Sequence, residues 1–542
     1  MPAADSAALL REIARRRTFA IISHPDAGKT TLTEKLLLFG GAVLLAGTVK
    51  ARKASRYAAS DWMAMEKERG ISVSTSVMSF TYAGCELNLL DTPGHQDFSE
   101  DTYRVLTAVD SALLVVDSAK GVEAQTKKLM DVCRMRKTPV VTFINKLDRL
   151  GLAPLEVMAD IESHLGMECV PLTWPVGMGS GFKGAYDLRK GELRLFSSAR
   201  GEKIQEAMVV IRDLDDERLD TYLGDQAEDL RADMELLRAA GTPFSVDRYL
   251  SGEQTPVFFG SALNNFGVRE LLESFVSFAP APLPRPARTE NGDVRLVRPE
   301  ETEFSGVVFK IQANMDKAHR DRMAFMRVCS GCFTRGMRLK HHRSGRESAV
   351  SNAAVFMARE RSGAETAYPG DIIGLPSHGT IKIGDTFTEK NFLKFTGIPS
   401  FAPEYFRRVR LRNPLKTKQL QKGLAQLAEE GAVQLFRPLA GNDYILGAVG
   451  LLQFEVIVSR LAEEYGVDAS YEDAGVSAAR WVQSEDRAVF AEFTDYYRQD
   501  LAIDAEGALA YLAPNPWKLE SAEERYPSVE FRVTREIEHV NT

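Results

Sequence analysis

The sequence predicts an α/β domain with a doubly wound parallel sheet and an inserted subdomain, followed by a β-barrel domain and an α+β domain. Three polar motifs each follow a short apolar run, as loops at the carboxyl ends of parallel strands do. The interval between the third motif and the last expected loop of the same kind, after the apolar run 255–259, is longer than one strand and one helix require, which indicates an insertion. After the proline-rich segment 279–286, which predicts an extended linker, the pattern changes to short strands separated by Gly, Asp and Pro turns.

The first motif follows the apolar run 18–22, which predicts a buried strand. Its ending, Gly-Lys-Thr, is typical of a loop whose backbone N–H groups hold phosphates at a helix N-terminus. We expect Lys29 to reach the β- and γ-phosphates and the Thr30 hydroxyl to bind Mg²⁺. The alternative for this motif alone is a turn without a ligand. The residues expected at the nucleotide are Ser23, His24, Pro25, Asp26, Ala27, Gly28, Lys29, Thr30 and Thr31.

The second motif follows the apolar run 87–90. There the carboxylate of Asp91 is placed to hold Mg²⁺ through a water, and the N–H of Gly94 to sense a γ-phosphate. The nucleotide-contacting residues expected here are Asp91, Thr92, Pro93, Gly94 and His95.

The third motif follows the run 139–144 and selects the base. The carboxylate of Asp148 can accept from N1–H and N2–H₂ of guanine, which adenine does not offer in that place, while the stem of Lys146 lies over the base. A further loop after the run 255–259 places a backbone N–H at the guanine carbonyl. The sequence therefore predicts binding of GTP and GDP and argues against an ATPase. The residues expected at the base are Asn145, Lys146, Leu147, Asp148, Ser261, Ala262 and Leu263.

At this point the chain resembles the translational GTPases. Arg-Gly-Ile-Ser at 69–72 and Asp-Thr-Pro-Gly-His at 91–95 are similar to their switch I and switch II. The resemblance implies that Ser72, where the family has threonine, joins Thr30 and Asp91 on Mg²⁺ in the GTP state. It implies that His95 is the catalytic histidine, which orients the attacking water on the ribosome; the alternative is a solvated loop histidine. Pro25 and Ile71 occupy the family's positions for an apolar gate beside it.

The motif spacing sets the domain ranges. Lys29 and Asp91 are 62 residues apart, Asp91 and Asn145 are 54 apart, but Asn145 and Ser261 are 116 apart. We therefore expect an α/β P-loop GTPase domain at 1–280 with an insertion at about 175–250. A β-barrel domain (domain II) follows at 295–388 and an α+β domain (domain III) at 389–542.

The second half resembles the class II release factors of the same family. The matching stretches lie at 309–315, 319–322, 368–371, 378–380, 395–399, 429–434 and 450–454. The resemblance implies a ribosome-dependent GTPase of translation termination that promotes dissociation and recycling of the stop-codon-reading release factors. Its partners would be the ribosome and those factors. The alternatives are a ribosome-protection or other ribosomal GTPase and a non-catalytic GTP-binding switch. We expect residues 390–542 to form one α+β domain, which leaves no room for the two further domains of a translocase.

Composition agrees with a globular, multidomain protein. The 542 residues are 44% hydrophobic and 26% charged, with a net charge of −7, which argues against a generally basic nucleic-acid binder. Two local basic runs, 335–346 and 407–422, contain no acid and are candidates for rRNA contact or solvated faces. Five cysteines show no disulfide framework. No secretory segment or membrane span is evident, so we expect a cytoplasmic protein. We also expect it to be a monomer.

Overall fold

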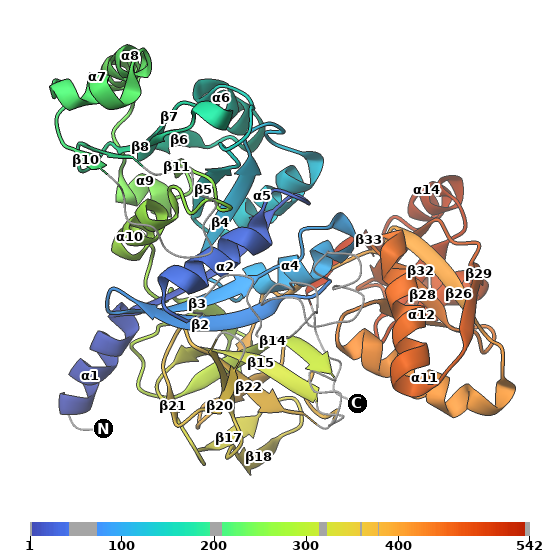
Figure 1. Cartoon of the computed structure of the whole chain (residues 1–542). Coiled ribbons are helices and arrows are strands. Elements are labelled where there is room, and N and C mark those ends of the chain that lie inside the picture. Colours follow the sequence, from blue (N-terminus) through green and yellow to red (C-terminus); the bar gives the residue numbers. More distant parts are fainter. Residues whose placement is uncertain are drawn as a thin grey trace.

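The computed structural model describes residues 3–42, 73–195, 209–313, 322–357, 360–377 and 379–536. Its N-terminal domain contains the strand order β2-β3-β1-β4-β5-β11-β6, in which all neighbours are parallel except β2 and β3 (Figure 1). The sheet continues beyond β2, which pairs with β19 (Ala354–Met357) of the following domain. The strands are β1 (Arg16–Ser23), β2 (Ser76–Tyr82), β3 (Cys85–Asp91), β4 (Ser111–Asp117), β5 (Val140–Asn145), β6 (Glu168–Pro171) and β11 (Gln254–Phe259). The predicted α/β fold class is confirmed.

Helices cover both faces of this sheet. One face packs against α2 (Lys29–Phe39) and α10 (Val268–Phe278). The other face packs against α4 (Ser99–Leu106), α5 (Ala124–Arg136) and α6 (Pro154–Leu165). The central strands are buried along their whole length, as expected for a parallel sheet covered on both sides. The polar motifs at their carboxyl ends therefore stand on a rigid support.

The surplus chain between β6 and β11 forms a small subdomain. It contains an antiparallel sheet in the order β10-β9-β8-β7 and two helices. Its buried Trp174 packs edge-on against Phe259 of β11, so the subdomain shares the core of the main sheet. The elements are β7 (Thr173–Val176), β8 (Gly184–Asp187), β9 (Glu192–Leu195), β10 (Val209–Ile211), α7 (Glu217–Leu223) and α8 (Gln226–Ala240), with α9 (Val246–Leu250) leading into β11.

A β-rich domain with its own core follows the proline-rich segment. Strands on both sides of the expected range 295–388 join this core: β12 pairs with both β13 and β24, and Ala287, Val297 and Phe395 belong to the barrel core. Its main strands are β14 (Ser305–Ala313), β15 (Arg322–Ser330), β17 (Arg338–His341), β18 (Arg346–Ala349), β19 (Ala354–Met357), β22 (Ile372–Pro376) and β23 (Thr386–Thr388). Shorter strands are β12 (Arg285–Arg288), β13 (Val294–Val297), β16 (Phe333–Thr334), β20 (Glu360–Gly363), β21 (Thr366–Ala367) and β24 (Lys394–Phe395).

The barrel is joined to the first domain through buried charges. Asp110, directly before β4, accepts from Arg327 of β15 at 2.7 Å and from Arg285 of β12 at 3.1 Å, and its side chain is fully buried. Burial, together with the neighbouring Arg327, lowers the pKa of Arg285 to about 10. Breaking a buried pair by removing one partner costs about 3–5 kcal/mol, so this contact fixes the barrel in place.

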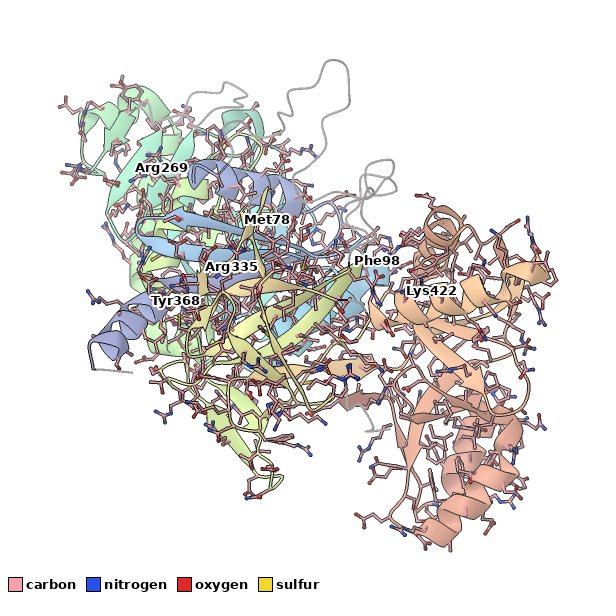
Figure 2. The ribbon with its side chains drawn as sticks, turned by 90° about the horizontal axis from the view of Figure 1, so that it is seen from below. Met78, Phe98, Arg269, Arg335, Tyr368 and Lys422 are labelled. Carbon is pink, nitrogen blue, oxygen red and sulfur yellow. The ribbon has the colours of Figure 1, made fainter. Side chains whose placement is uncertain are left out.

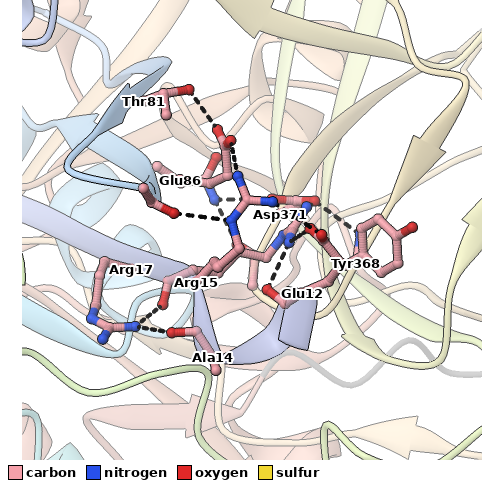
Figure 3. A network of polar contacts seen from close by, with 12 residues as sticks. Glu12, Ala14, Arg15, Arg17, Thr81, Glu86, Tyr368 and Asp371 are labelled. Carbon is pink, nitrogen blue, oxygen red and sulfur yellow. Dashed lines mark hydrogen bonds and ion pairs between the residues drawn. The ribbon is translucent and has the colours of Figure 1, made fainter. Parts of the chain in front are cut away.

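A second polar network joins the N-terminal segment to the barrel (Figure 3). Arg16, after α1 (Ala3–Ala14), pairs with Asp371 at 2.9 Å and lies over the ring of Tyr368. The hydroxyl of Thr18 donates to the carbonyl of Gly370 at 2.6 Å. The stretch 368–371, which carries part of the sequence resemblance, is therefore a contact between two domains.

The C-terminal domain is α+β, as predicted. Its sheet has the order β29-β26-β28-β27-β31-β32-β30-β33, with α11 and α12 packed on one half and α13 and α14 on the other (Figure 1). The helices are α11 (Thr417–Glu429), α12 (Leu451–Tyr465), α13 (Arg487–Tyr496) and α14 (Pro516–Arg525). The strands are β25 (Pro399–Phe401), β26 (Tyr405–Leu411), β27 (Gln434–Pro438), β28 (Ile445–Ala448), β29 (Ala469–Asp473), β30 (Ala478–Gln483), β31 (Leu501–Ile503), β32 (Leu509–Ala513), β33 (Glu530–Arg532) and β34 (Thr534–Glu536).

Within the described ranges, no helix has both the length and the apolar character needed to cross a bilayer.

Candidate nucleotide site

Asn145 connects the predicted phosphate loop to the loop after β11. Its Nδ2 donates to the carbonyl of Ala27 at 2.8 Å, and its Oδ1 accepts from the N–H of Ala262 at 2.9 Å. The side chain is buried, so these hydrogen bonds are protected from water. Three of the predicted loops therefore meet at the carboxyl ends of β1, β5 and β11.

Gly28 is required by this close approach. Its φ is +95°, a left-handed conformation that an L side chain rarely adopts, and an added Cβ would lie 2.3 Å from Nδ2 of Asn145. The turn at Gly28 leads into α2, whose first residues are Lys29 and Thr30. Asp26 also has a positive φ, of 64°, which makes the loop a tight turn in front of a helix N-terminus. The backbone N–H groups of such a turn suit an anion.

Lys29 lies against Asp91, and the two form a buried ion pair. The second carboxylate oxygen of Asp91, Oδ2, is buried and has no hydrogen-bond partner in the described part of the chain. A buried carboxylate oxygen of this kind fits a cation or a cation-bound water. Thr30 and Thr31, both partly exposed, follow Lys29 in the first turn of α2. Asp91 and Thr30 therefore fit the predicted Mg²⁺ role; Ser72, the third predicted ligand, and Ile71 lie outside the described residues.

Lys146 is held by an acid that the sequence reasoning did not single out. Its Nζ donates to Oδ2 of Asp117 at 2.9 Å, while Oδ1 of Asp117 accepts from the N–H of Ala119. Burial opposes ionisation of Asp117, but the hydrogen bonds from Lys146 and Ala119, together with the charge of Lys146, outweigh it and lower the pKa of the carboxyl below its usual value. Asp117 ends the apolar run of β4, so it carried the same signal as Asp91 and Asn145: a polar residue at the carboxyl end of a buried strand.

Asp148 and Ser261, both predicted to lie at the base, contact each other. The hydroxyl of Ser261 donates to Oδ1 of Asp148 at 2.6 Å. Leu147 is buried and its N–H donates to the carbonyl of Gly260, whereas Leu263 is exposed. The structure thus brings Asp148, Ser261 and Ala262 together and leaves Leu263 at the rim.

Two histidines lie in different environments. His24, inside the phosphate loop, is fully buried, and neither of its ring nitrogens has a hydrogen-bond partner in the described part of the chain. Burial lowers the pKa of His24, so it stays neutral near pH 7. His95 is 34% exposed and caps the short helix η1 (Gln96–Phe98). The imidazole lies beyond the end of β3 and is not packed in the hydrophobic core.

The remaining predicted residues pack against the phosphate loop. The Thr92 hydroxyl donates to the carbonyl of Ile21 at 2.7 Å, and a Cβ at Gly94 would lie 3.6 Å from the carbonyl of His24. Ser23 hydrogen-bonds locally, to the carbonyl of His24. The other two residues, Pro25 and Pro93, are half-buried and buried, respectively.

The two basic runs are partly neutralised. In 335–346, Arg335, Arg338 and Arg343 pair with Glu365, Glu347 and Asp385. In 407–422, Arg408 and Arg410 both pair with Asp443, and Arg410 also with Glu472. These acids lie outside the two runs, so the runs are less basic in the fold than along the chain. Lys418 and Lys422, on one side of α11, are exposed (Figure 2 labels Lys422).

Comparison with known proteins agrees with this geometry. The elongation factor Tu GTP binding domain matches residues 14–281, elongation factor G domain 2 matches 303–390, and the C-terminal domain of class II release factor RF3 matches 395–523. A crystal structure of a protein from Thermus thermophilus is similar with a TM-score of 0.67 and 21% identity, covering 88% of this chain and 71% of that one. At that identity the likeness concerns the fold alone.

The chain belongs to the translational GTPases of the elongation factor G and elongation factor Tu class. Its GTPase domain implies binding of GTP and GDP. The C-terminal domain separates it from the elongation factors themselves, and the succession of three domains fits release factor 3.

Proposed function

We propose that this protein is a ribosome-stimulated GTPase of translation termination. It uses GTP to promote dissociation and recycling of the stop-codon-reading release factors after the peptide is freed. The observation that carries this proposal is the match of 395–523 to the C-terminal domain of class II release factor RF3, directly after a GTPase domain and an elongation factor G domain 2. Members of the translational GTPase family act on the ribosome, which supports the same partner here. We propose that the protein works there as a cytoplasmic monomer.

In the proposed mechanism, the loop 23–31 holds the phosphates and Lys29 exchanges its partner. The ammonium group pairs with Asp91 in this structure and would turn to the phosphates when nucleotide binds. Thr30, Asp91 and Ser72 would hold Mg²⁺, which would supply positive charge against the phosphate oxygens. Asp148 selects guanine, and Asn145 holds the phosphate and base loops in register.

His95 is the proposed catalytic residue. Its imidazole would orient the water that attacks the γ-phosphate once the ribosome has positioned it. The partly exposed ring, on a short turn beyond β3, supports a side chain that can change its orientation. Slow hydrolysis away from the ribosome is part of this proposal, because the described residues beside the phosphate loop include no evident arginine finger for the transition state.

The test is GTP turnover by the full-length protein, alone, with empty 70S ribosomes, and with 70S ribosomes that carry a bound, labelled release factor. We expect ribosomes to accelerate hydrolysis and GTP to accelerate loss of the label. Acceleration of hydrolysis without any loss of label would favour a ribosome-protection or other ribosomal role. No ribosome-dependent phosphate release at all would favour a non-catalytic GTP-binding switch.

A further inference from the structure

The segment after β3 contacts the C-terminal domain through Asp97. Oδ2 of Asp97 accepts from the N–H of Leu452, at the start of α12, over 2.7 Å. The two residues are 355 positions apart, and Asp97 is buried in the contact. Figure 2 shows the neighbouring Phe98 at the junction between the two bodies of the molecule.

This hydrogen bond satisfies a group that a helix leaves open. The first N–H groups of a helix have no partner within it, and a carboxylate there is also favoured by the helix dipole. In α12 the side chain of Gln453 caps Val449 and Gly450, whereas Leu452 is capped by Asp97 from the other domain. The N-terminus of α12 is therefore completed only when the two domains are docked.

Gly450 leaves the space that Asp97 fills. A Cβ at position 450 would lie 2.0 Å from Cγ of Asp97. The φ of Gly450 is −147°, which any residue can adopt, so the requirement for glycine is one of space and not of backbone conformation. A Gly450→Ala variant therefore needs no change of backbone conformation, but its methyl group would exclude the side chain of Asp97.

Apolar and polar contacts surround the hydrogen bond between Asp97 and Leu452. Phe98 packs with Val73 and Val456 in one small cluster, with Leu452 against it. Val73 directly follows the predicted switch I residue Ser72 in sequence. On the next helix, Arg104 pairs with Glu100 and donates to the carbonyl of Gly431 at 3.2 Å. The contact therefore combines the ends of both switch segments with domain III.

Asp97 also faces the proposed catalytic histidine. Nδ1 of His95 lies 3.3 Å from the backbone nitrogen of Asp97, whose N–H it accepts, and 3.3 Å from Oδ1 of the same residue. One oxygen of Asp97 thus lies at His95 and the other at α12. A change at either end alters the position of the same carboxylate.

We propose that Asp97 is a positioning residue through which docked domain III restrains His95. Docking fixes Asp97, Asp97 fixes the turn that His95 caps, and the imidazole is held in its capping orientation. To orient a water, His95 must leave that orientation and lose the hydrogen bond from Asp97. Domain III, when docked, therefore slows hydrolysis in the free protein, and its release makes His95 available. This inference rests on the catalytic role proposed for His95.

The test uses full-length variants and single-turnover GTP hydrolysis without ribosomes. Gly450→Ala excludes Asp97 from the domain III side, and Asp97→Ala removes the carboxylate from the other side. We expect both to raise the rate about three- to tenfold, the range given by loss of one or two modest hydrogen bonds. Leu451→Ala, an exposed neighbour in α12, is the matched control and should leave the rate unchanged.

Two readouts separate positioning from general loosening. Amide exchange of the peptide containing Leu452 should accelerate in Gly450→Ala and Asp97→Ala but not in Leu451→Ala. The gain in rate should vanish in Gly450→Ala/His95→Ala. Faster exchange with an unchanged rate, a gain that persists without His95, or unchanged exchange would each overturn the inference.

Failure of the inference is distinguishable from failure of the proposed function. If His95→Ala alone keeps the ribosome-stimulated rate, the catalytic role of His95 is wrong and the inference falls with it. If His95→Ala loses that rate while Gly450→Ala behaves as wild type without ribosomes, only the link to domain III is overturned.

Discussion

The hydroxyl of Ser261 donates to Oδ1 of Asp148 over 2.6 Å, which joins two loops 113 residues apart on the side where we propose that the base binds. The contact orients the carboxylate that the sequence assigns to guanine recognition. The hydroxyl of Ser261 needs only one oxygen at position 148, so the side chain there can be either a carboxylate or an amide. The other oxygen of Asp148 stays available for the base.

Asp148→Asn should therefore change base preference without disturbing the loop. An amide keeps an oxygen for Ser261 but presents a donor in place of an acceptor, which weakens GTP and favours xanthine nucleotides, whose O2 needs a donor. We expect at least a tenfold reversal in relative affinity, measured by competition with a fluorescent guanine nucleotide. ATP competing equally with GTP in the wild type would contradict the assignment of this loop.

His95→Ala should leave nucleotide affinity nearly unchanged and remove most of the ribosome-stimulated rate. The side chain is partly exposed and caps only a short turn, so its loss costs little stability. Loss of a group that acts only in the transition state lowers kcat, here by on the order of 10³ or more. Rapid-quench hydrolysis on 70S ribosomes measures this, and an unchanged rate would rule the role out.

Lys418 and Lys422 are better probes of ribosome contact than the paired arginines of the same run. Both are exposed on α11, whereas Arg408 and Arg410 are engaged by Asp443. Lys418→Glu/Lys422→Glu should weaken ribosome binding and lower the slope of log affinity against log salt by about one for each lost phosphate contact. Lys518→Glu, on exposed α14, is the control for a charge change alone. Equal salt slopes for the wild type, the double variant and the Lys518→Glu control would identify this part of α11 as a solvated face.

The barrel should lose stability in mild acid through His342. Burial, with Lys340 and His341 nearby, lowers the pKa of His342 to about 4, whereas an unfolded histidine titrates near 6.5. Between these values only the unfolded chain binds the proton, so stability falls as pH drops from about 6.5 toward 4. His342→Gln should flatten this dependence by about 1 kcal/mol, a value reduced for solvent screening because the ring is only half-buried. Urea midpoints at several pH values test this; parallel curves for both proteins would contradict it.

Much of the candidate site could be predicted because its signals are local. Asp91, Asn145 and the loop at Ser261 each follow a short buried strand, and the strands of a parallel sheet end together. Asp117 carries the same signal and was missed because it belongs to none of the motifs considered.

The contacts between domains could not be predicted in this way. Asp97 and Leu452 have no shared pattern in the sequence, because their hydrogen bond depends on how two separately folded domains dock. The pairing of Arg408 and Arg410 with Asp443 was missed for a similar reason: strand register brings distant acids beside a run that looks basic along the chain. The pairing of β12 with β24 was not predicted, because both strands are too short to show a clear alternation.

The ion pairs of Asp110 with Arg285 and Arg327 have a practical consequence for dissecting this protein. A fragment that stops at the end of the GTPase match, residue 281, would keep the buried acid and lose both arginines. Such a fragment should express poorly and bind nucleotide weakly even with every nucleotide-contacting residue intact. We therefore expect the first two domains to depend on each other for stability, so that the shortest useful truncation retains both.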